Sequence, residues 1–253
     1  MLFRSKSNKV NAAIIIIGNE ILSGRTQDVN LAHISKWLNA HGVQVKEVRI
    51  IPDLESEIIT NVNELRKKFN YIFTTGGIGP THDDITAKSI AKAFNLKYEI
   101  HKEAFVILKK HYKAGEFNES RQKMAKMPYN ARLIFNPSSG APGFIVENVF
   151  CLPGIPFILQ SMLGNLKNEI FGGKPLISKT INLRTVESEI AVPLKEIQEK
   201  NDKVEIGSYP FIKAGKVGVA IVLRSEDESK INICNEQILE LITSKKIQII
   251  NKD

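Results

Sequence analysis

The stretch Thr-Thr-Gly-Gly-Ile-Gly-Pro-Thr-His-Asp-Asp at residues 74–84 contains the residue types that could hold a phosphate and a metal ion together. Its glycines are Gly76, Gly77 and Gly79. They let the backbone turn tightly and bring its N–H groups close to an anion, and a helix that follows adds the positive end of its dipole. Asp83 and Asp84 would repel a bare phosphate, so their position beside this loop indicates a bridging divalent cation.

Helix capping is the competing interpretation of these polar residues. Thr and Asp are ordinary N-caps, and one of Thr81, Asp83 and Asp84 is expected to cap the helix that follows. Two acids and a threonine within four positions exceed what capping needs, which favours a functional site. The pattern is neither a dinucleotide-binding G-x-G-x-x-G nor a P-loop, so neither of those mechanisms is implied.

A second polar loop follows the first apolar run of the chain and includes the acids Glu20 and Asp28. Arg25 is a fixed cation suited to phosphate oxygens, and Gly18 and Gly24 leave room for the backbone. Asp28 taken alone is equally well explained as the N-cap of the next helix. Because the carboxyl ends of parallel strands open on one edge of a sheet, we expect both loops to face a single cleft.

A third candidate combines residues 136–143 with the turn Pro153-Gly154-Ile155-Pro156. Ser138 and Ser139 could hydrogen-bond a ligand, and Gly140 permits close approach. A plain surface turn explains the spacing slightly better. His82 is the one histidine that falls within a candidate site.

Periodicity along the first part of the chain predicts a parallel α/β sheet with right-handed crossovers, because strands alternate with helices. The expected strands are 12–17, 43–50 and 71–75, and the expected helices are 28–40, 55–69, 84–94, 103–111, 121–126 and 156–170. Two short apolar runs, 144–146 and 149–152, have the signature of a hairpin with a two-residue turn. Residues 43–50 alternate only if one irregularity is allowed.

Phe171-Gly172-Gly173-Lys174-Pro175 is the best domain boundary, since it is dense in residues that break regular structure. Beyond it we expect a small α+β module with strands at 178–183, 204–209 and 217–223 and helices at 188–199 and 233–242. Gly215-Lys216-Val217-Gly218 formally matches the loop of KH RNA-binding modules. A hairpin turn is the favoured interpretation, because the flanking residues have strand character.

Composition favours a cytoplasmic globular protein. The 253 residues are 43% hydrophobic and 25% charged, and the formal net charge of +8 comes mostly from scattered lysines. Scattered lysines are typical of a solvated surface rather than of a nucleic-acid footprint. Cys151 and Cys234 are far apart in apolar surroundings, which argues against a disulfide framework. No apolar run is long enough for a membrane span or a signal peptide.

Four segments in order resemble the MoaB/Mog molybdopterin-binding domain family, and most closely the amino-terminal part of CinA-like proteins. They are IIIIGNEILSGRTQDVN (14–30), TTGGIGPTHDD (74–84), SGAPGF (139–144) and LPGIP (152–156). The resemblance implies a three-layer, mostly parallel sheet over residues 12–171, followed by a CinA-type α+β module over 175–250. That module often has Gly-Glu-Ser in the family. Here Val186 replaces the glycine, and the amidohydrolase activity of long CinA proteins is not expected.

CinA-like members resemble metal-dependent pyrophosphatases acting on nucleoside diphosphate derivatives such as ADP-ribose, and related domains accompany FAD synthetases. The resemblance therefore implies a hydrolase that uses Mg²⁺, Mn²⁺ or Co²⁺, and a homo-oligomer. A molybdopterin-binding or adenylyltransferase-like protein of molybdenum cofactor biosynthesis is the alternative, and a non-catalytic ligand sensor is the third. The ligand is a small nucleotide or a pterin.

Carried over by position, the resemblance implies a role for each of the matching polar and glycine residues. Catalytic or metal-binding roles fall to Asp83, Asp84, Glu20 and Asp28, with Glu20 or Asp28 also a candidate general base. Ligand contacts fall to Gly76, Gly77, Gly79, Pro80, Thr81, Ser23, Gly24, Asn30, Ser139, Gly140, Pro153 and Gly154.

Overall fold

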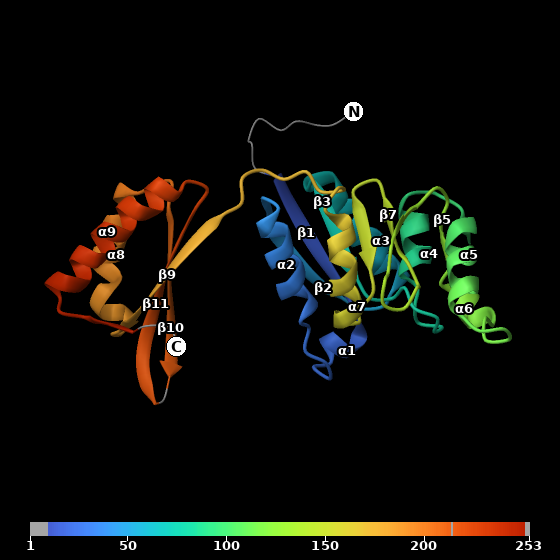
Figure 1. The fold of residues 1–253 in the computed structure, drawn as a ribbon, viewed down its shortest axis with the longest axis horizontal. Helices are drawn as coiled ribbons and strands as arrows, with labels where there is room; N and C mark the ends of the chain where they lie inside the picture. The colour runs from blue at the N-terminus through green and yellow to red at the C-terminus, as the bar shows by residue number, and fades with distance from the viewer. Residues whose placement is uncertain (1–9, 214, 251–253) are drawn as a thin grey trace. The chain divides into compact units, whose positions relative to one another are not determined.

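A computed structural model describes residues 10–213 and 215–250 of the chain. The chain divides between Lys174 and Pro175 into two compact units (Figure 1). Each unit has its own hydrophobic core. They are described separately below.

The first unit is built on a mostly parallel sheet, as the sequence predicted. Its strand order is β2-β1-β3-β8-β7-β6. The four strands from β2 to β8 are parallel, β7 is antiparallel to β8, and β6 is antiparallel to β7. These strands are β1 (Val10–Ile17), β2 (Val43–Ile51), β3 (Tyr71–Thr75), β6 (Arg132–Ile134), β7 (Gly143–Val146) and β8 (Val149–Leu152). The β7–β8 pairing confirms the predicted hairpin.

Helices cover both faces of this sheet, so the predicted three-layer arrangement is confirmed (Figure 1). β1 is central, and its alternate residues enter two cores. Ala13, Ile15 and Ile17 pack with α3 and α4, whereas Ile14 and Ile16 pack on the opposite face with α2 and α7. The helices of the unit are α1 (Asn19–Leu22), α2 (Asn30–Ala40), α3 (Glu55–Lys68), α4 (Thr86–Ala93), α5 (Lys102–His111), α6 (Glu119–Lys123) and α7 (Pro156–Leu163).

Several element boundaries differ from the sequence prediction. The short helix α1 was expected to be loop, and α2 and α4 each begin two residues later than predicted. α7 ends at Leu163, where the chain tightens into the 3₁₀ turn η1 (Gly164–Leu166). Among the three-residue strands that were not predicted, β4 (Tyr98–Ile100) and β5 (Lys126–Pro128) pair with each other, and β5 takes up Lys126, which was expected to end a helix. Three-residue strands carry too little periodicity to be recognised.

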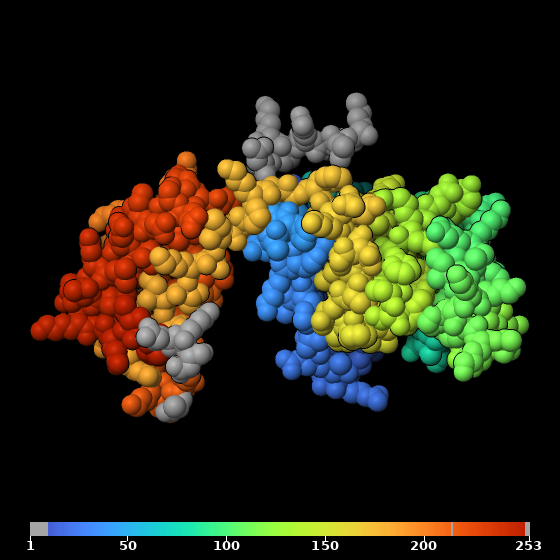
Figure 2. All heavy atoms as spheres, in the orientation of Figure 1, coloured from blue at the N-terminus to red at the C-terminus, as the bar shows by residue number. Residues whose placement is uncertain are grey.

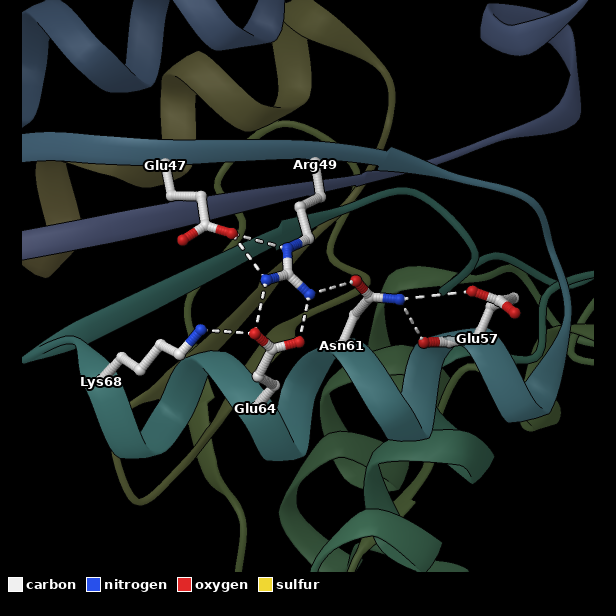
Figure 3. Close-up of polar contacts among 6 residues, drawn as sticks. All are labelled: Glu47, Arg49, Glu57, Asn61, Glu64 and Lys68. Atoms are coloured by element: carbon white, nitrogen blue, oxygen red, sulfur yellow. Dashed lines mark hydrogen bonds and ion pairs between the residues drawn. The ribbon is translucent and has the colours of Figure 1, made fainter.

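A charged cluster ties the edge strand β2 to α3 (Figure 3). The guanidinium of Arg49 donates to Glu64 at 2.7 and 2.9 Å and to Asn61 at 2.8 Å, and Nε donates to Glu47 at 2.7 Å. Lys68 also pairs with Glu64. These contacts raise the pKa of Arg49, mainly through Glu64, and lower the pKa of Glu64 to about 2, mainly through Arg49.

This cluster predicts acid sensitivity of a defined sign. The pKa of Glu64 falls from 4.5 to about 2 on folding. Its stabilising contribution is therefore complete above pH 4.5 and is lost as the pH falls toward 2. The melting temperature of Glu64→Gln should lie below that of the unmodified protein at pH 6, and the gap should narrow as the pH falls from 4.5 toward 2. A gap that is constant from pH 7 to pH 3 would contradict this assignment.

The second unit is a small α+β module, as predicted. Its four-stranded antiparallel sheet has the order β10-β11-β9-β12, and α8 and α9 lie on one side of it (Figure 1). The Gly215–Gly218 segment belongs to the β10–β11 hairpin, so the hairpin interpretation is correct. The elements are β9 (Ile177–Arg184), α8 (Glu187–Lys200), β10 (Glu205–Lys213), β11 (Lys216–Ser225), α9 (Glu228–Ser244) and β12 (Gln248–Ile250).

Candidate functional site

The carboxyl edge of the parallel sheet brings the predicted loops together. The N–H of Gly76 donates to the carbonyl of Leu152 at 3.1 Å, and the N–H of Gly18 donates to that of Ile51 at 3.2 Å. A Cβ placed on Gly154 would lie 3.5 Å from the Cα of Gly76. The loops after β1, β3 and β8 therefore meet at one place, because these strands are parallel neighbours.

Gly76 and Gly77 are required by the path of the loop after β3. Both have positive φ, 96° and 68°. A Cβ on Gly76 would lie 2.2 Å from the carbonyl oxygen of Ile17, and one on Gly77 would lie 2.2 Å from Oγ1 of Thr86. Thr86 is buried and closes the loop, since its hydroxyl donates to the carbonyl of Gly76 at 3.0 Å and its N–H to that of Gly77 at 2.9 Å.

The acids of this loop have different surroundings. Oδ2 of Asp84 accepts a hydrogen bond from the N–H of Thr81 at 2.8 Å and another from its hydroxyl. Gly79 leaves room for this carboxylate, since a Cβ there would lie 2.7 Å from Oδ2. Asp83 is exposed, and hydrogen bonding, first with Thr81, lowers its pKa. Asp84 therefore braces the loop, while Asp83 is an accessible anion.

The capping interpretation of this loop is wrong. α4 begins at Thr86 with Ile85 at its N-cap, and no side chain caps it. Thr81, Asp83 and Asp84 lie in the preceding turn, where the N–H of Asp84 donates to the carbonyl of Thr81 at 3.3 Å. Pro80 is exposed at the same turn.

Two residues that the sequence analysis did not single out contact these loops. Nζ of Lys123, at the end of α6, donates to the carbonyl of Thr81. Oδ2 of Asp53 accepts from the N–H of Asn19 at 2.8 Å and so holds the start of α1. Asp53 follows the carboxyl end of β2, so the rule that placed the other loops at this edge would have found it. Lys123 is distant in sequence and gave no such signal.

A hollow of about 70 Å³ opens at the ends of β1, β3 and β8. It is lined in part by Glu20, Thr26, Asp28, Asn30, Thr75 and Gly154. In the space-filling view, the segment that carries α1 projects from the surface of the first unit (Figure 2). The hollow thus joins the acids of the first loop to the turn after β8.

Asp28 is not the N-cap of α2, since Val29 is in that position without a side-chain cap, but its carboxylate bonds to the first turn. Its Oδ1 accepts from the N–H of Leu31 at 2.9 Å, although α2 itself starts at Asn30. Ser23 is exposed and turns its hydroxyl back to the carbonyl of Glu20 at 3.2 Å. Gly24 is exposed with a positive φ of 72° and nothing near its Cβ position.

The loop between β6 and β7 lies at the same edge, because β7 runs antiparallel to β8. Asn136 organises it. Its Nδ2 donates to the hydroxyl of Ser139 and to the carbonyl of Ala141, both at 2.8 Å, and its Oδ1 accepts from the N–H of Ser138 at 3.0 Å. Gly140 lies against the ring of His111, and a Cβ there would lie 2.8 Å from Cγ of that ring. Internal bonds thus account for this turn.

Comparison with known proteins identifies the first unit. Residues 13–172 match the family model described as "Probable molybdopterin binding domain". The chain belongs to this molybdopterin-binding-domain family. The second unit of this family member, at residues 175–250, matches the model "FAD synthase, middle domain".

Whole-chain relatives of this molybdopterin-binding-domain protein occur in archaea. A protein of Archaeoglobus fulgidus is 35% identical over 233 residues, which cover 92% of this chain and 98% of that protein. A protein of Caldivirga maquilingensis is 32% identical over 250 residues, which cover 94% and 97%. The solved structure of the CinA protein with unknown function from Thermoplasma acidophilum is 35% identical with a TM-score of 0.60, and covers 64% of this chain and 99% of that chain. The resemblance to CinA-like proteins is thereby confirmed.

Three further observations concern the residues that the structure describes. Among residues 10–213 and 215–250, no three Asp, Glu, His or Cys side chains are grouped to hold a metal ion by themselves. Burial raises the pKa of the Cys151 thiol to about 12, so this cysteine is a core residue and not a nucleophile. No helix of the described residues is long and apolar enough to cross a membrane.

Proposed function

We propose that this protein is a metal-dependent pyrophosphatase that hydrolyses a nucleoside diphosphate derivative of the ADP-ribose or FAD type. The observation that carries the proposal is the convergence, at one sheet edge, of a glycine loop with an acid-lined hollow. Gly76 joins the loop to the turn after β8, and Glu20 and Asp28 line the hollow beside that turn. Cleaving a diphosphate needs both donors for phosphate oxygens and carboxylates for a cation.

The carboxylates fit a divalent cation that is shared with the substrate. Mg²⁺-type ions prefer oxygen ligands and are usually held by one or two carboxylates together with substrate phosphates, rather than by a cage of protein side chains. Asp83, with its lowered pKa, is an anion at neutral pH. Asp83 and Asp84 on one loop and Asp28 and Glu20 on the other are the candidate ligands. A bound cation would neutralise the diphosphate and promote ionisation of water.

The other residues of the edge would bind and orient the substrate. The loop from Gly77 to Gly79 would offer backbone N–H groups to the phosphate oxygens. Lys123 adds a cation beside Thr81 and would attract the same anion. Glu20 is exposed next to the hollow and would accept a proton from the attacking water, a role that contributes about 10²–10⁴-fold in rate.

The second unit supports a dinucleotide substrate. Its match to the middle domain of FAD synthase associates the chain with proteins that handle FAD. We therefore place FAD beside ADP-ribose as the first compounds to test.

The experiment is to incubate the full chain with ADP-ribose or FAD and with Mg²⁺, Mn²⁺, Co²⁺ or EDTA, and to measure AMP by chromatography. AMP that appears only with a metal ion supports the proposal. If neither compound releases AMP with any of the metal ions, the proposal is wrong.

Molybdopterin binding, with or without adenylyl transfer, is the second candidate. It is supported by the family of the first unit. The same loops would then hold the pterin phosphate and ATP. Calorimetric binding of molybdopterin, together with metal-dependent turnover of ATP and without release of AMP from ADP-ribose or FAD, would favour this candidate.

A further inference from the structure

Asn30 has a buried amide oxygen that is unused by the fold. The side chain is at the start of α2, and the residue is 4% exposed. Its Nδ2 donates to the carbonyl of Gly154 at 2.7 Å, whereas Oδ1 is buried and has no hydrogen-bond partner. The amide cannot be turned over to relieve this, because Oδ1 would then face another acceptor.

An unpaired buried acceptor reduces stability, and such groups are rare in folded proteins. A structural role would be served by the donor half of the amide alone. The oxygen is therefore the part of Asn30 that needs an explanation outside the fold.

The surroundings of Asn30 indicate what the oxygen could bind. The hollow is also lined by Glu20 and Asp28, and none of the described residues that line it is lysine or arginine. Asp28 is held in place by the N–H of Leu31. An amide oxygen and two carboxylates are the oxygen ligands that hard divalent cations prefer. A hollow of about 70 Å³ has room for a cation and about two waters at roughly 30 Å³ each.

We propose that Oδ1 of Asn30 is a ligand of a divalent cation that the hollow holds with Asp28 and Glu20. This rests on the proposed function, which requires such a cation, and it names a neutral ligand beside the acids. The bond from Nδ2 to Gly154 fixes the oxygen in place and links the cation to the turn after β8.

The test measures binding of Mn²⁺ to the full chain by electron paramagnetic resonance, without substrate, alongside thermal unfolding in EDTA. Asn30→Leu keeps the volume and removes the oxygen. We expect its Mn²⁺ affinity to fall by about tenfold or more. Its melting temperature in EDTA should fall modestly, because the variant also loses the Nδ2 bond to Gly154. Unchanged affinity would overturn the proposal and leave an ordered water as the partner of Oδ1. Failure of the unmodified chain to bind millimolar Mn²⁺ would also overturn it.

Two further variants protect the test against misfolding of Asn30→Leu. Asn30→Asp keeps an oxygen and adds a charge, although its second oxygen takes the place of the donor to Gly154. It should bind Mn²⁺ more tightly than Asn30→Leu does, and binding as weak as that of Asn30→Leu would contradict the assignment. Asn61→Leu is the matched control. Asn61 is equally buried in α3, but both halves of its amide are bonded, to Glu57 and Arg49. This control should melt at a lower temperature and keep its Mn²⁺ affinity.

The outcome is separable from the fate of the proposed function. If Asn30→Leu loses Mn²⁺ while no dinucleotide is cleaved by any form, the cation site stands and the pyrophosphatase proposal falls. If AMP release requires metal but Asn30→Leu binds Mn²⁺ normally, the pyrophosphatase proposal stands and the assignment of Asn30 as a cation ligand falls.

Discussion

Asp83→Ala should lower metal-dependent release of AMP by at least about a hundredfold, on the scale of losing one preorganised charged group in an active site. Its melting temperature should stay within about 2 °C, because Asp83 is exposed and substitutions at such positions change stability little. The measurements are kcat/KM for ADP-ribose or FAD at saturating Mg²⁺ and a thermal unfolding curve.

Asp84→Ala should reduce activity as strongly but should also destabilise the protein. The carboxylate accepts two hydrogen bonds from Thr81, and bonds to a charged acceptor contribute about 1.5–3 kcal/mol. The loop that offers the phosphate-binding N–H groups would lose its brace. Asp202→Ala removes an exposed acid of the second unit and is the control for general charge effects.

The contrast between the two acids is the decisive part of this comparison. If both variants retained full turnover, these carboxylates would have no role in holding a metal ion. If only Asp84→Ala lost activity, in proportion to its loss of stability, the Asp84 side chain would have a structural role alone.

The second large effect is expected from Gly76→Ala. The added methyl group would meet the carbonyl oxygen of Ile17 at 2.2 Å while the backbone stays at a φ of 96°. Strain and displacement together should cost about 2–4 kcal/mol, and the transition of the first unit should move down by about 5–15 °C. AMP release should be lost, because the loop must move away from β1.

Two glycines separate the causes of this effect. Gly115 has a positive φ of 82° but nothing within 4 Å of its Cβ position, so Gly115→Ala measures backbone strain alone, about 1 kcal/mol. Gly164 has a helical φ of −58° and open space, so Gly164→Ala should be neutral or slightly stabilising. If Gly76→Ala destabilises the protein no more than Gly115→Ala does, the loop can move away from Ile17 at little cost in stability.

Much of the fold follows from local patterns in the chain. The continuous apolar run at residues 12–17 is typical of a strand buried on both faces, and the residues of β1 do enter a core on each side of the sheet. The irregularity expected in β2 is real, since its register with β1 shifts between Ala12 and Ala13. Both features depend on side-chain periodicity, which a sequence displays directly.

The ends of helices and strands and the roles of single side chains were harder to predict from the sequence. α1 was missed because a four-residue helix with no buried residues has no apolar stripe to recognise. Asp84 was expected to be a helix cap or a metal ligand. Its role as the brace of its own loop depends on the close approach that Gly79 permits, which spacing does not reveal.

The amino-acid sequence by itself determined the family, the order of the longer strands and helices, and the residue types gathered in each polar loop. Tertiary structure decided which of those loops touch. Gly154 reaches Asn30 across 124 positions of the chain, and Lys123 reaches Thr81 across 42. It also decided that one oxygen of Asn30 is left unpaired. The physical reason is that patterns record which face of an element is buried, whereas hydrogen-bond satisfaction depends on contacts between segments distant in sequence.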